Sequence, residues 1–330
     1  MRVESSVTAV SWIPSEAVEG IAKLPFEMGP THYDDPPPEV IEDVEAFIKS
    51  DGAREANELR AYIEVEEGKI TDYGYSGRGH LGSTILRFGK REMDVAAIPM
   101  PLIQKDPETG DDWVRFTQTA GGRTGLPTPR TVRRKPFFQI AAPVAWTTLS
   151  LTLHADGSVE SEVAGASPFP RHWIYDDSGK LVQKVGIIDF KKWYKEAFGQ
   201  HTPWGNEDSP AFVTAAESSL ERELSRSIMR SGAKPKKLKL KKDSVLVEQG
   251  KPGDELFLLL DGVLSVEVDG EKVAEVGPGA ILGERAIIEG GARTSTLRGL
   301  TECRVVSIPG DRIDRTALEE VARGHRREKR

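Results

Sequence analysis

The sequence has few of the residues that build disulfide frameworks, metal clusters and membrane spans. Among its 330 residues the single cysteine is Cys303, which excludes an internal disulfide framework and a cysteine-rich zinc site and is typical of a reducing cytosol. No apolar run approaches the roughly 20 residues that a membrane-spanning helix needs. The N-terminus has no basic stretch followed by an apolar one, so no signal peptide is expected. We therefore expect a cytoplasmic chain with no membrane span and no bound metal.

The charge of the chain is acidic overall but unevenly spread. The net charge is −7, whereas residues 233–330 hold 19 Lys/Arg against 17 Asp/Glu. Overall acidity argues against a nucleic-acid partner. One basic run, Lys234 to Lys242, alternates lysines with Leu238 and Leu240, which predicts a strand with one solvated face. The alternative interpretation of this run is a patch that binds a membrane or a nucleic acid.

The first part of the chain is predicted to be rich in antiparallel strands. Apolar residues from Val40 to Ile48 have helical spacing, which predicts a short helix that begins at Asp34–Pro38 and ends near Gly52. Between residues 56 and 187 the apolar residues alternate, and turn signals such as Asp156-Gly157 separate the runs. This pattern predicts a β-sandwich or an open barrel. A second short helix is expected over residues 188–198.

A connecting helix is predicted between the two halves of the chain. Ser209-Pro210 is a favourable helix start, and apolar residues recur every fourth position from Phe212 to Ile228 before Gly232. Its apolar face has three candidate partners: the C-terminal part, the β-rich part, or a second protomer, which would form a homodimer through helix 210–231. The expected domains are residues 1–205 (β-rich), 206–232 (connecting helix) and 233–330 (β-roll with a short C-terminal helix), a mainly β fold with a jelly-roll-like C-terminal part.

Residues 243–282 consist of short apolar runs separated by glycine turns, which is typical of a double-sheet roll. The segment that follows, Gly283 to Thr296, carries the chemistry. Gly283 and Glu284 lie ten and nine residues ahead of Arg293, and a helical turn is expected between them. An anionic phosphodiester suits backbone N–H groups at a helix start and a guanidinium with forked donors. A carboxylate beside them can accept a hydrogen bond from a ribose hydroxyl.

With these residues in place, the C-terminal part resembles the cyclic-nucleotide-binding domain family over about residues 233–310. The motifs that carry the resemblance are Gly250, Gly253-Asp254, Gly262, Gly277-Pro-Gly279, Gly283-Glu284-x-Ala286 and Arg293-Thr-Ser. The resemblance implies that Glu284 accepts from the ribose 2′-hydroxyl and that Arg293 pairs with the cyclic phosphate. It further implies that the amides of Arg285 and Ala286 and the amide or hydroxyl of Thr294, followed by Ser295, complete the site beside Gly283. The implied ligand is cAMP ahead of cGMP, and Thr294 is compatible with either.

Residues 1–205 contain no catalytic signature. The module that opens with Ser11-Trp-Ile-Pro-Ser15 resembles only uncharacterised bacterial proteins. The leading hypothesis is therefore a cyclic-nucleotide sensor whose allosteric signal regulates the N-terminal module. One alternative is a nucleotide-regulated enzyme with its active site in residues 1–205, in a pocket combining His201, Asp208 and another histidine (His32, His154 or His172). The other alternative is an interaction scaffold with a vestigial roll. No cofactor is expected beyond the nucleotide ligand.

Overall fold

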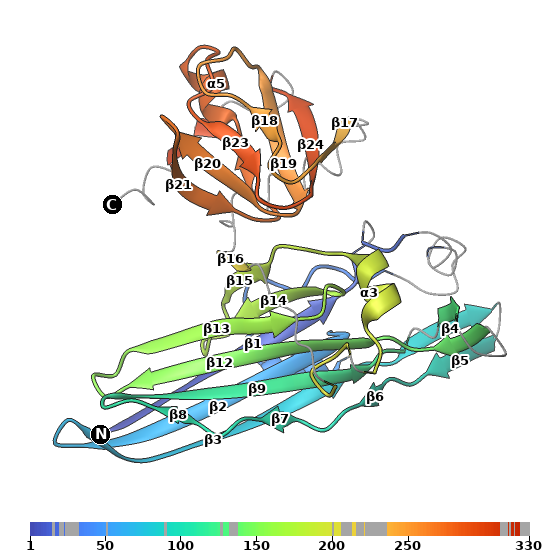
Figure 1. The fold of residues 1–330 in the computed structure, drawn as a ribbon, viewed down its shortest axis with the longest axis vertical. Helices are drawn as coiled ribbons and strands as arrows, with labels where there is room; N and C mark the ends of the chain where they lie inside the picture. The colour runs from blue at the N-terminus through green and yellow to red at the C-terminus, as the bar shows by residue number, and fades with distance from the viewer. Residues whose placement is uncertain are drawn as a thin grey trace. The chain divides into compact units, whose positions relative to one another are not determined.

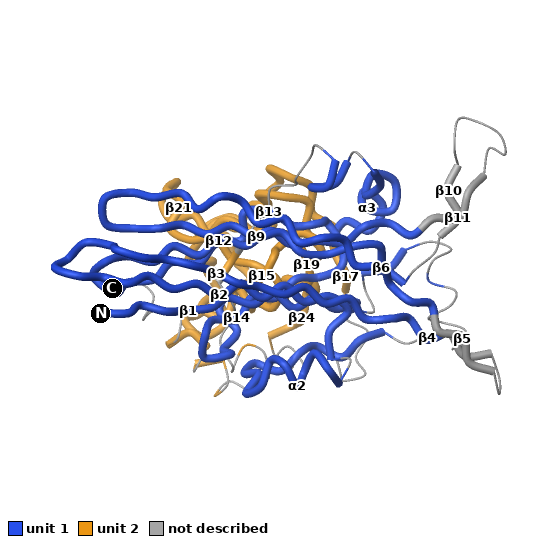
Figure 2. Tube along the Cα trace, turned by 90° about the horizontal axis from the view of Figure 1, so that it is seen from below, with its two compact units in different colours: residues 1–182, 188–211 blue, residues 183–187, 212–330 orange. Residues whose placement is uncertain are grey.

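In the computed structural model the chain divides into two compact units, coloured separately in Figure 2. Unit 1 comprises Met1–Val182 and Ile188–Ala211, and unit 2 comprises Gln183–Ile187 and Phe212–Arg330. The structure describes residues 1–14, 17–19, 23, 33–50, 52–88, 91–125, 128–131, 138–199, 201–205, 213–215, 221, 236–310, 316, 318–319 and 321–323. None of the helices in these ranges is both long and apolar enough to cross a membrane.

Unit 1 is built from two antiparallel sheets with two small hairpins. One sheet has the order β14-β1-β2-β3, and the other has the order β13-β12-β9-β6 with β7 and β8 also on β9. Figure 1 shows β9, β12 and β13 side by side. The strands are β1 (Arg2–Trp12), β2 (Glu55–Glu66), β3 (Lys69–Leu81), β4 (Thr84–Phe88), β5 (Arg91–Val95), β6 (Ile98–Pro99), β7 (Ile103–Gln104), β8 (Glu108–Thr109), β9 (Trp113–Arg123), β10 (Thr128–Thr131), β11 (Phe138–Ala141), β12 (Val144–His154), β13 (Val159–Ala166), β14 (Arg171–Tyr175) and the beginning of β15 (Leu181–Val185).

The two sheets of unit 1 pack face to face, so the sandwich alternative of the sequence prediction describes them. Leu149, Leu151 and Leu153 of β12 are fully buried between them. The Asn57 side-chain amide on β2 donates to the Thr147 carbonyl on β12 over 2.9 Å, which joins the sheets by a hydrogen bond. The sequence prediction missed β1. Every residue from Val7 to Trp12 is buried, on both faces of the strand, so this strand lacks the period-two signal of a half-exposed one.

Each of the two helices in the described part of unit 1 begins at an aspartate that caps it. Helix α2 (Val44–Lys49) starts after Asp43, whose side chain accepts from the Ala46 amide over 2.9 Å. The predicted start at Asp34–Pro38 is therefore wrong, because this stretch is not helical and Tyr175 binds the carbonyl of Pro38. Helix α3 (Phe190–Glu196) starts after Asp189 and lies inside the predicted range 188–198.

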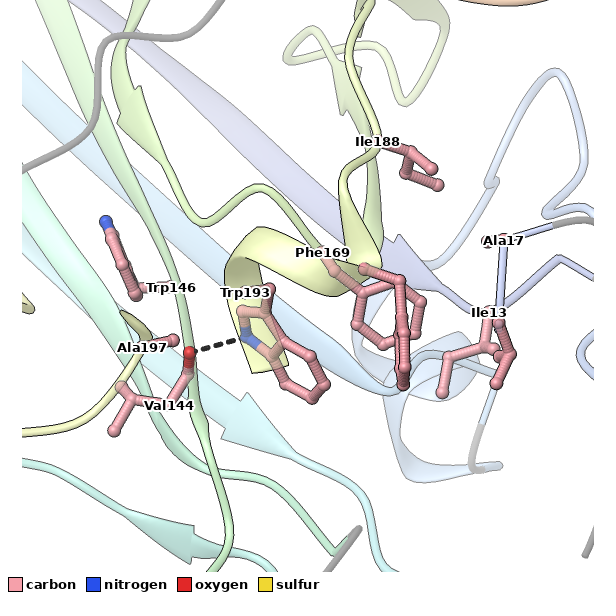
Figure 3. Close-up of a cluster of buried hydrophobic side chains, with 10 residues drawn as sticks. Ile13, Ala17, Val144, Trp146, Phe169, Ile188, Trp193 and Ala197 are labelled. Atoms are coloured by element: carbon pink, nitrogen blue, oxygen red, sulfur yellow. Dashed lines mark hydrogen bonds between the residues drawn. The ribbon is translucent and has the colours of Figure 1, made fainter. Parts of the chain in front are cut away.

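Helix α3 is attached to the sandwich by a cluster of buried aromatic and aliphatic side chains (Figure 3). Trp193 is fully buried, and its indole Nε1 donates to the Val144 carbonyl of β12 over 2.8 Å. The rings of Phe169 and Trp193 have their centroids 4.6 Å apart. Burial of such large rings supplies much of the free energy that holds a short helix on a sheet.

Unit 2 contains the double-sheet roll predicted for the C-terminal part. Its two four-stranded sheets have the orders β17-β24-β19-β22 and β18-β23-β20-β21. The elements are β16 (Val213–Ala215), β17 (Lys236–Leu240), β18 (Val245–Val247), β19 (Glu255–Asp261), β20 (Leu264–Val268), β21 (Glu271–Val276), β22 (Ile281–Leu282), α5 (Glu284–Glu289), β23 (Thr296–Gly299) and β24 (Cys303–Pro309). In β17 the three lysines are exposed and Leu240 is buried, as the alternating pattern predicted.

The predicted connecting helix is wrong at its beginning. Val213–Ala215 form strand β16, which pairs antiparallel with Gln183–Val185 of β15. Two of these three residues, Val213 and Thr214, are β-branched and favour an extended backbone. Their preference for a strand outweighs the four-residue spacing of apolar residues that predicted a helix. Glu221 is helical, and the remainder of residues 206–232 lies outside the described residues. The homodimer predicted through this helix stays a prediction.

Candidate functional site

The predicted phosphate-binding segment begins where β22 ends and α5 starts. Gly283 precedes the first turn of α5 and has a φ of 91°, in the left-handed region that favours glycine. A Cβ atom at this position would also lie 2.6 Å from Nη1 of Arg293. No side chain caps α5, whose first turn contains Glu284, Arg285 and Ala286. Both the backbone conformation and the close approach of a guanidinium therefore require glycine here.

Arg293 is buried, with 5% of its surface exposed, and is held mainly by backbone. Its Nη1 donates to the Glu255 carbonyl over 2.8 Å, and its guanidinium carbon lies 5.1 Å from the centre of the Phe257 ring. Its Nε is buried and has no hydrogen-bond partner in the described part of the chain. Burial lowers the pKa of Arg293, whereas the carboxylates of Glu255, Asp254 and Glu284 raise it. The guanidinium is thus fixed in place, and its Nε–H can still donate a hydrogen bond.

Gly253 makes room for this guanidinium. A Cβ atom on Gly253 would lie 2.1 Å from Nε of Arg293 and 2.4 Å from its guanidinium carbon. Two backbone hydrogen bonds hold the neighbouring segments together: the Gly253 amide donates to Gly291, and the Arg293 amide donates to Lys251, each over 2.8 Å. Gly253 does not have a left-handed φ, so the requirement for glycine here comes from the close approach to Arg293.

The segment from Gly283 to Ser295 forms one side of a cavity of about 340 Å³. A cavity of this size is in the range of small-molecule sites. All seven residues predicted to bind the ligand line it: Gly283, Glu284, Arg285, Ala286, Arg293, Thr294 and Ser295. The structure therefore brings together the residues that the sequence proposed, while their contacts with a ligand stay a prediction. Glu284 is 5% exposed and sits close enough to Arg293 for their charges to interact.

The other side of the cavity was not predicted from the sequence. It is an aliphatic surface supplied by the sheet β18-β23-β20-β21. Its residues are Val247, Val266, Val268, Val273, Ala274, Val276 and Leu297, with Leu282 beside them. The only sequence signal for this surface was the series of short strands separated by glycine turns. That pattern does not show which residues of different strands share a face. The register that pairs Val266 with both Leu297 and Ala274 brings them together.

Three of the candidate histidines, His154, His172 and His201, lie in the described part of unit 1 and have different neighbours. His172 lies on β14 and is fully buried; its Nδ1 lies 2.7 Å from Ser11 Oγ and its Nε2 lies 2.9 Å from the Ser167 carbonyl. A carbonyl only accepts, so Nε2 carries the proton and Nδ1 accepts from Ser11. Ser11 Oγ lies 3.4 Å from Glu55, which is also buried. Burial lowers the pKa of His172 to about 4 and raises the pKa of Glu55 to about 8, so both groups are neutral near pH 7.

This row of neutral groups is a structural feature of the sandwich interior. The cavity that Glu55 lines has a volume of about 20 Å³, which is too small for a substrate. His154 lies on β12 with its Nε2 3.9 Å from Glu160, and His201 lies in a turn where its amide donates to the Phe198 carbonyl. His32 and Asp208 lie outside the described residues.

Comparisons with known proteins match the C-terminal part. Residues 237–320 match the family model of the cyclic nucleotide-binding domain. A cyclic nucleotide-gated potassium channel of Mesorhizobium japonicum is 37% identical over 65 residues, which are 20% of this chain and 18% of the channel. A cGMP-dependent protein kinase of Caenorhabditis briggsae is 32% identical over 60 residues, which are 18% of this chain and 8% of the kinase. The chain therefore spans less than a fifth of the length of these curated relatives.

Solved structures also match part of the chain. A putative cyclic nucleotide-binding protein from Geobacter metallireducens is 26% identical, with a TM-score of 0.25, and the match covers 32% of this chain and 89% of that one. A cyclic nucleotide-binding domain from Methylobacillus flagellatus is 28% identical, with a TM-score of 0.22, and the match covers 27% and 49% of the two chains. With the family model and the described roll, residues 237–320 of this chain are a cyclic nucleotide-binding domain.

Proposed function

We propose that the chain is a cytosolic cyclic-nucleotide sensor, in which the roll of unit 2 binds cAMP, with cGMP as the weaker ligand, and regulates unit 1. The observation that carries this proposal is the cavity that gathers Glu284 and Arg293 beside an aliphatic surface. The buried Nε of Arg293 is a charged donor that has no partner among the described residues, and leaving such a group unpaired costs roughly 1–3 kcal/mol or more. An oxygen of the cyclic phosphate would satisfy it.

The remaining contacts follow from the same arrangement. The Glu284 carboxylate would accept from the ribose 2′-hydroxyl, which distinguishes ribose from deoxyribose. The base would lie on the aliphatic surface that Val266 and Leu297 help to form. Guanine has more polar groups along its edge than adenine, and a polar group buried without a partner is costly. This difference favours cAMP, and the hydroxyl of Thr294 is the group that would partly compensate guanine.

Thermal unfolding of the full chain with and without nucleotide tests the binding. A ligand at 100 times its dissociation constant stabilises the folded state by about 2.7 kcal/mol, so saturating cAMP raises the melting temperature and cGMP raises it less. Glu284→Gln reduces the shift. Arg298→Ala serves as the matched control, because Arg298 pairs with Glu267 and does not line the cavity. Equal melting temperatures with and without millimolar nucleotide would reject the proposal.

Regulation of unit 1 is tested separately by hydrogen exchange of the full chain. A coupling free energy between two sites is typically about 1–3 kcal/mol and cannot exceed the ligand's differential affinity for the two states. Saturating cAMP should therefore change the exchange of amides within Met1–Val182 in the wild-type chain. A variant with weakened binding, Glu284→Gln, should show a smaller change at the same cAMP concentration. Binding without any change in unit 1 would leave the roll a cyclic-nucleotide site and remove its regulatory role.

A further inference from the structure

Arg285 is the third charged residue that lines the cavity, together with Glu284 and Arg293. It is half-exposed, and in the part of the chain that the structure describes its side chain has no hydrogen bond, ion pair or ring contact. Other arginines of unit 2 are paired: Arg298 with Glu267 over 3.0 Å, and Arg304 with Asp261 over 2.9 Å. Among the described residues, the charge of Arg285 therefore has no partner.

The position of Arg285 in its helix gives no reason for a cation. It occupies the first turn of α5, where the helix dipole favours an acidic residue such as Glu284 and disfavours a basic one. An aliphatic residue at this position would serve the helix at least as well. The arginine thus reduces the stability of the turn slightly, so helix stability does not explain why a cation is present at this position.

The charges around the cavity indicate what a second cation would do. The guanidinium of Arg293 is close enough to three carboxylates, those of Glu255, Asp254 and Glu284, for their charges to act on it. Three negative charges against one positive charge oppose the entry of an anionic ligand. A half-exposed guanidinium on the cavity lining offsets part of that repulsion, and it offers forked donors for a phosphate oxygen.

We propose that Arg285, acting through its guanidinium, is a second cationic contact for the phosphate of the cyclic nucleotide and speeds the entry of anionic ligands. This inference rests on the proposed function of the cavity. It assigns Arg285 a role in addition to that of its backbone amide. Since a half-exposed charge is screened by salt, whereas the deeply buried Arg293 is screened much less, the contribution of Arg285 should depend on ionic strength.

The test is calorimetric titration of the full chain with cAMP in low and high sodium chloride, with association rates from a fluorescent cAMP analogue. Arg285→Leu should weaken binding about tenfold in low salt and flatten the salt dependence of affinity and association rate, and Arg285→Lys should lie between it and the wild type. The unliganded melting temperature of Arg285→Leu should be equal to that of the wild type or higher. Arg298→Leu is the matched control and should leave both constants unchanged.

The outcomes separate this inference from the proposed function. If the wild type binds cAMP and Arg285→Leu binds it equally well with the same salt dependence, the inference is overturned and the proposed function stands. An equal loss in Arg285→Leu and Arg285→Lys at both salt concentrations would also overturn it, because that loss would be structural. If the wild type binds no cyclic nucleotide, the proposed function fails first.

Discussion

Replacing Gly253 by alanine should displace Arg293 without altering any charged or polar group of the site. The added Cβ atom would lie 2.1 Å from Nε of Arg293, whereas ordinary contact begins near 3.4 Å. The guanidinium would have to move by more than an ångström, away from the Glu255 carbonyl that now accepts its Nη1–H. Because Gly253 does not have a left-handed φ, the backbone itself tolerates alanine.

The size of the effect follows from the contact that is lost. A hydrogen bond to a charged group contributes about 1.5–3 kcal/mol, which corresponds to between about tenfold and 150-fold in a dissociation constant. Gly253→Ala should therefore weaken cAMP binding by at least about tenfold. The unfolding free energy should change less, because the obstructing atoms belong to a side chain that can shift.

Calorimetric titration with cAMP measures the affinity of Gly253→Ala, and thermal unfolding reports its stability. The control is Gly157→Ala in unit 1, where the φ is 93° and no atom lies within 4 Å of the added Cβ. This control loses stability through backbone strain but keeps its affinity. Binding of cAMP by Gly253→Ala within twofold of the wild type would refute this role of Gly253.

Three further predictions concern other parts of the molecule. Glu55→Gln should remove a pH dependence between about pH 6.5 and 8. The pKa of Glu55 is raised to about 8 in the fold, so its contribution to stability is lost as pH rises from about 4.5 to 8, whereas His172, with its pKa lowered to about 4, adds stability as pH rises from about 4 to 6.5 and offsets that loss there. Denaturant unfolding should therefore show a loss of stability in the wild type between about pH 6.5 and 8 and a flatter curve for the variant in that range. Trp193→Phe loses the hydrogen bond to the Val144 carbonyl and should cost roughly 1–3 kcal/mol in denaturant unfolding, with cAMP affinity unchanged. Thr294→Val should weaken cGMP binding more than cAMP binding in parallel titrations, and an equal loss for both ligands would place the hydroxyl on the phosphate instead.

The part of the site that is local in sequence could be predicted, because its geometry is set by adjacent residues. Gly283, Glu284 and Arg293 lie within eleven positions of one another, and a glycine, a helical turn and an arginine in that order limit how the chain can fold between them. The pattern thus identified the charged side of the cavity. The mainly β character was likewise predictable from alternating residues and glycine turns.

The aliphatic side could not be predicted, because it depends on the register of four strands. Val266 contributes to the cavity only because it lies opposite Leu297 and Ala274, and a shift by one residue would turn it to the other face. The role of Gly253 depends in the same way on a contact with a residue forty positions away. The connecting helix was wrongly predicted at β16 for a different reason. The helical spacing of apolar residues around Val213 was a weak signal, and pairing with β15 outweighed it.

Substitution of Arg293 tests the central claim, the binding of a cyclic nucleotide by this cavity, most directly. The measurement is calorimetric titration of the full chain with cAMP, in the wild type, Arg293→Lys and Arg293→Ala. The wild type should show saturable binding of one cAMP per chain with a dissociation constant below the millimolar range. Arg293→Lys keeps the charge but not the forked donors and should bind more weakly, and Arg293→Ala more weakly still. No saturable binding in the wild type, or equal affinity in Arg293→Ala, would contradict the account.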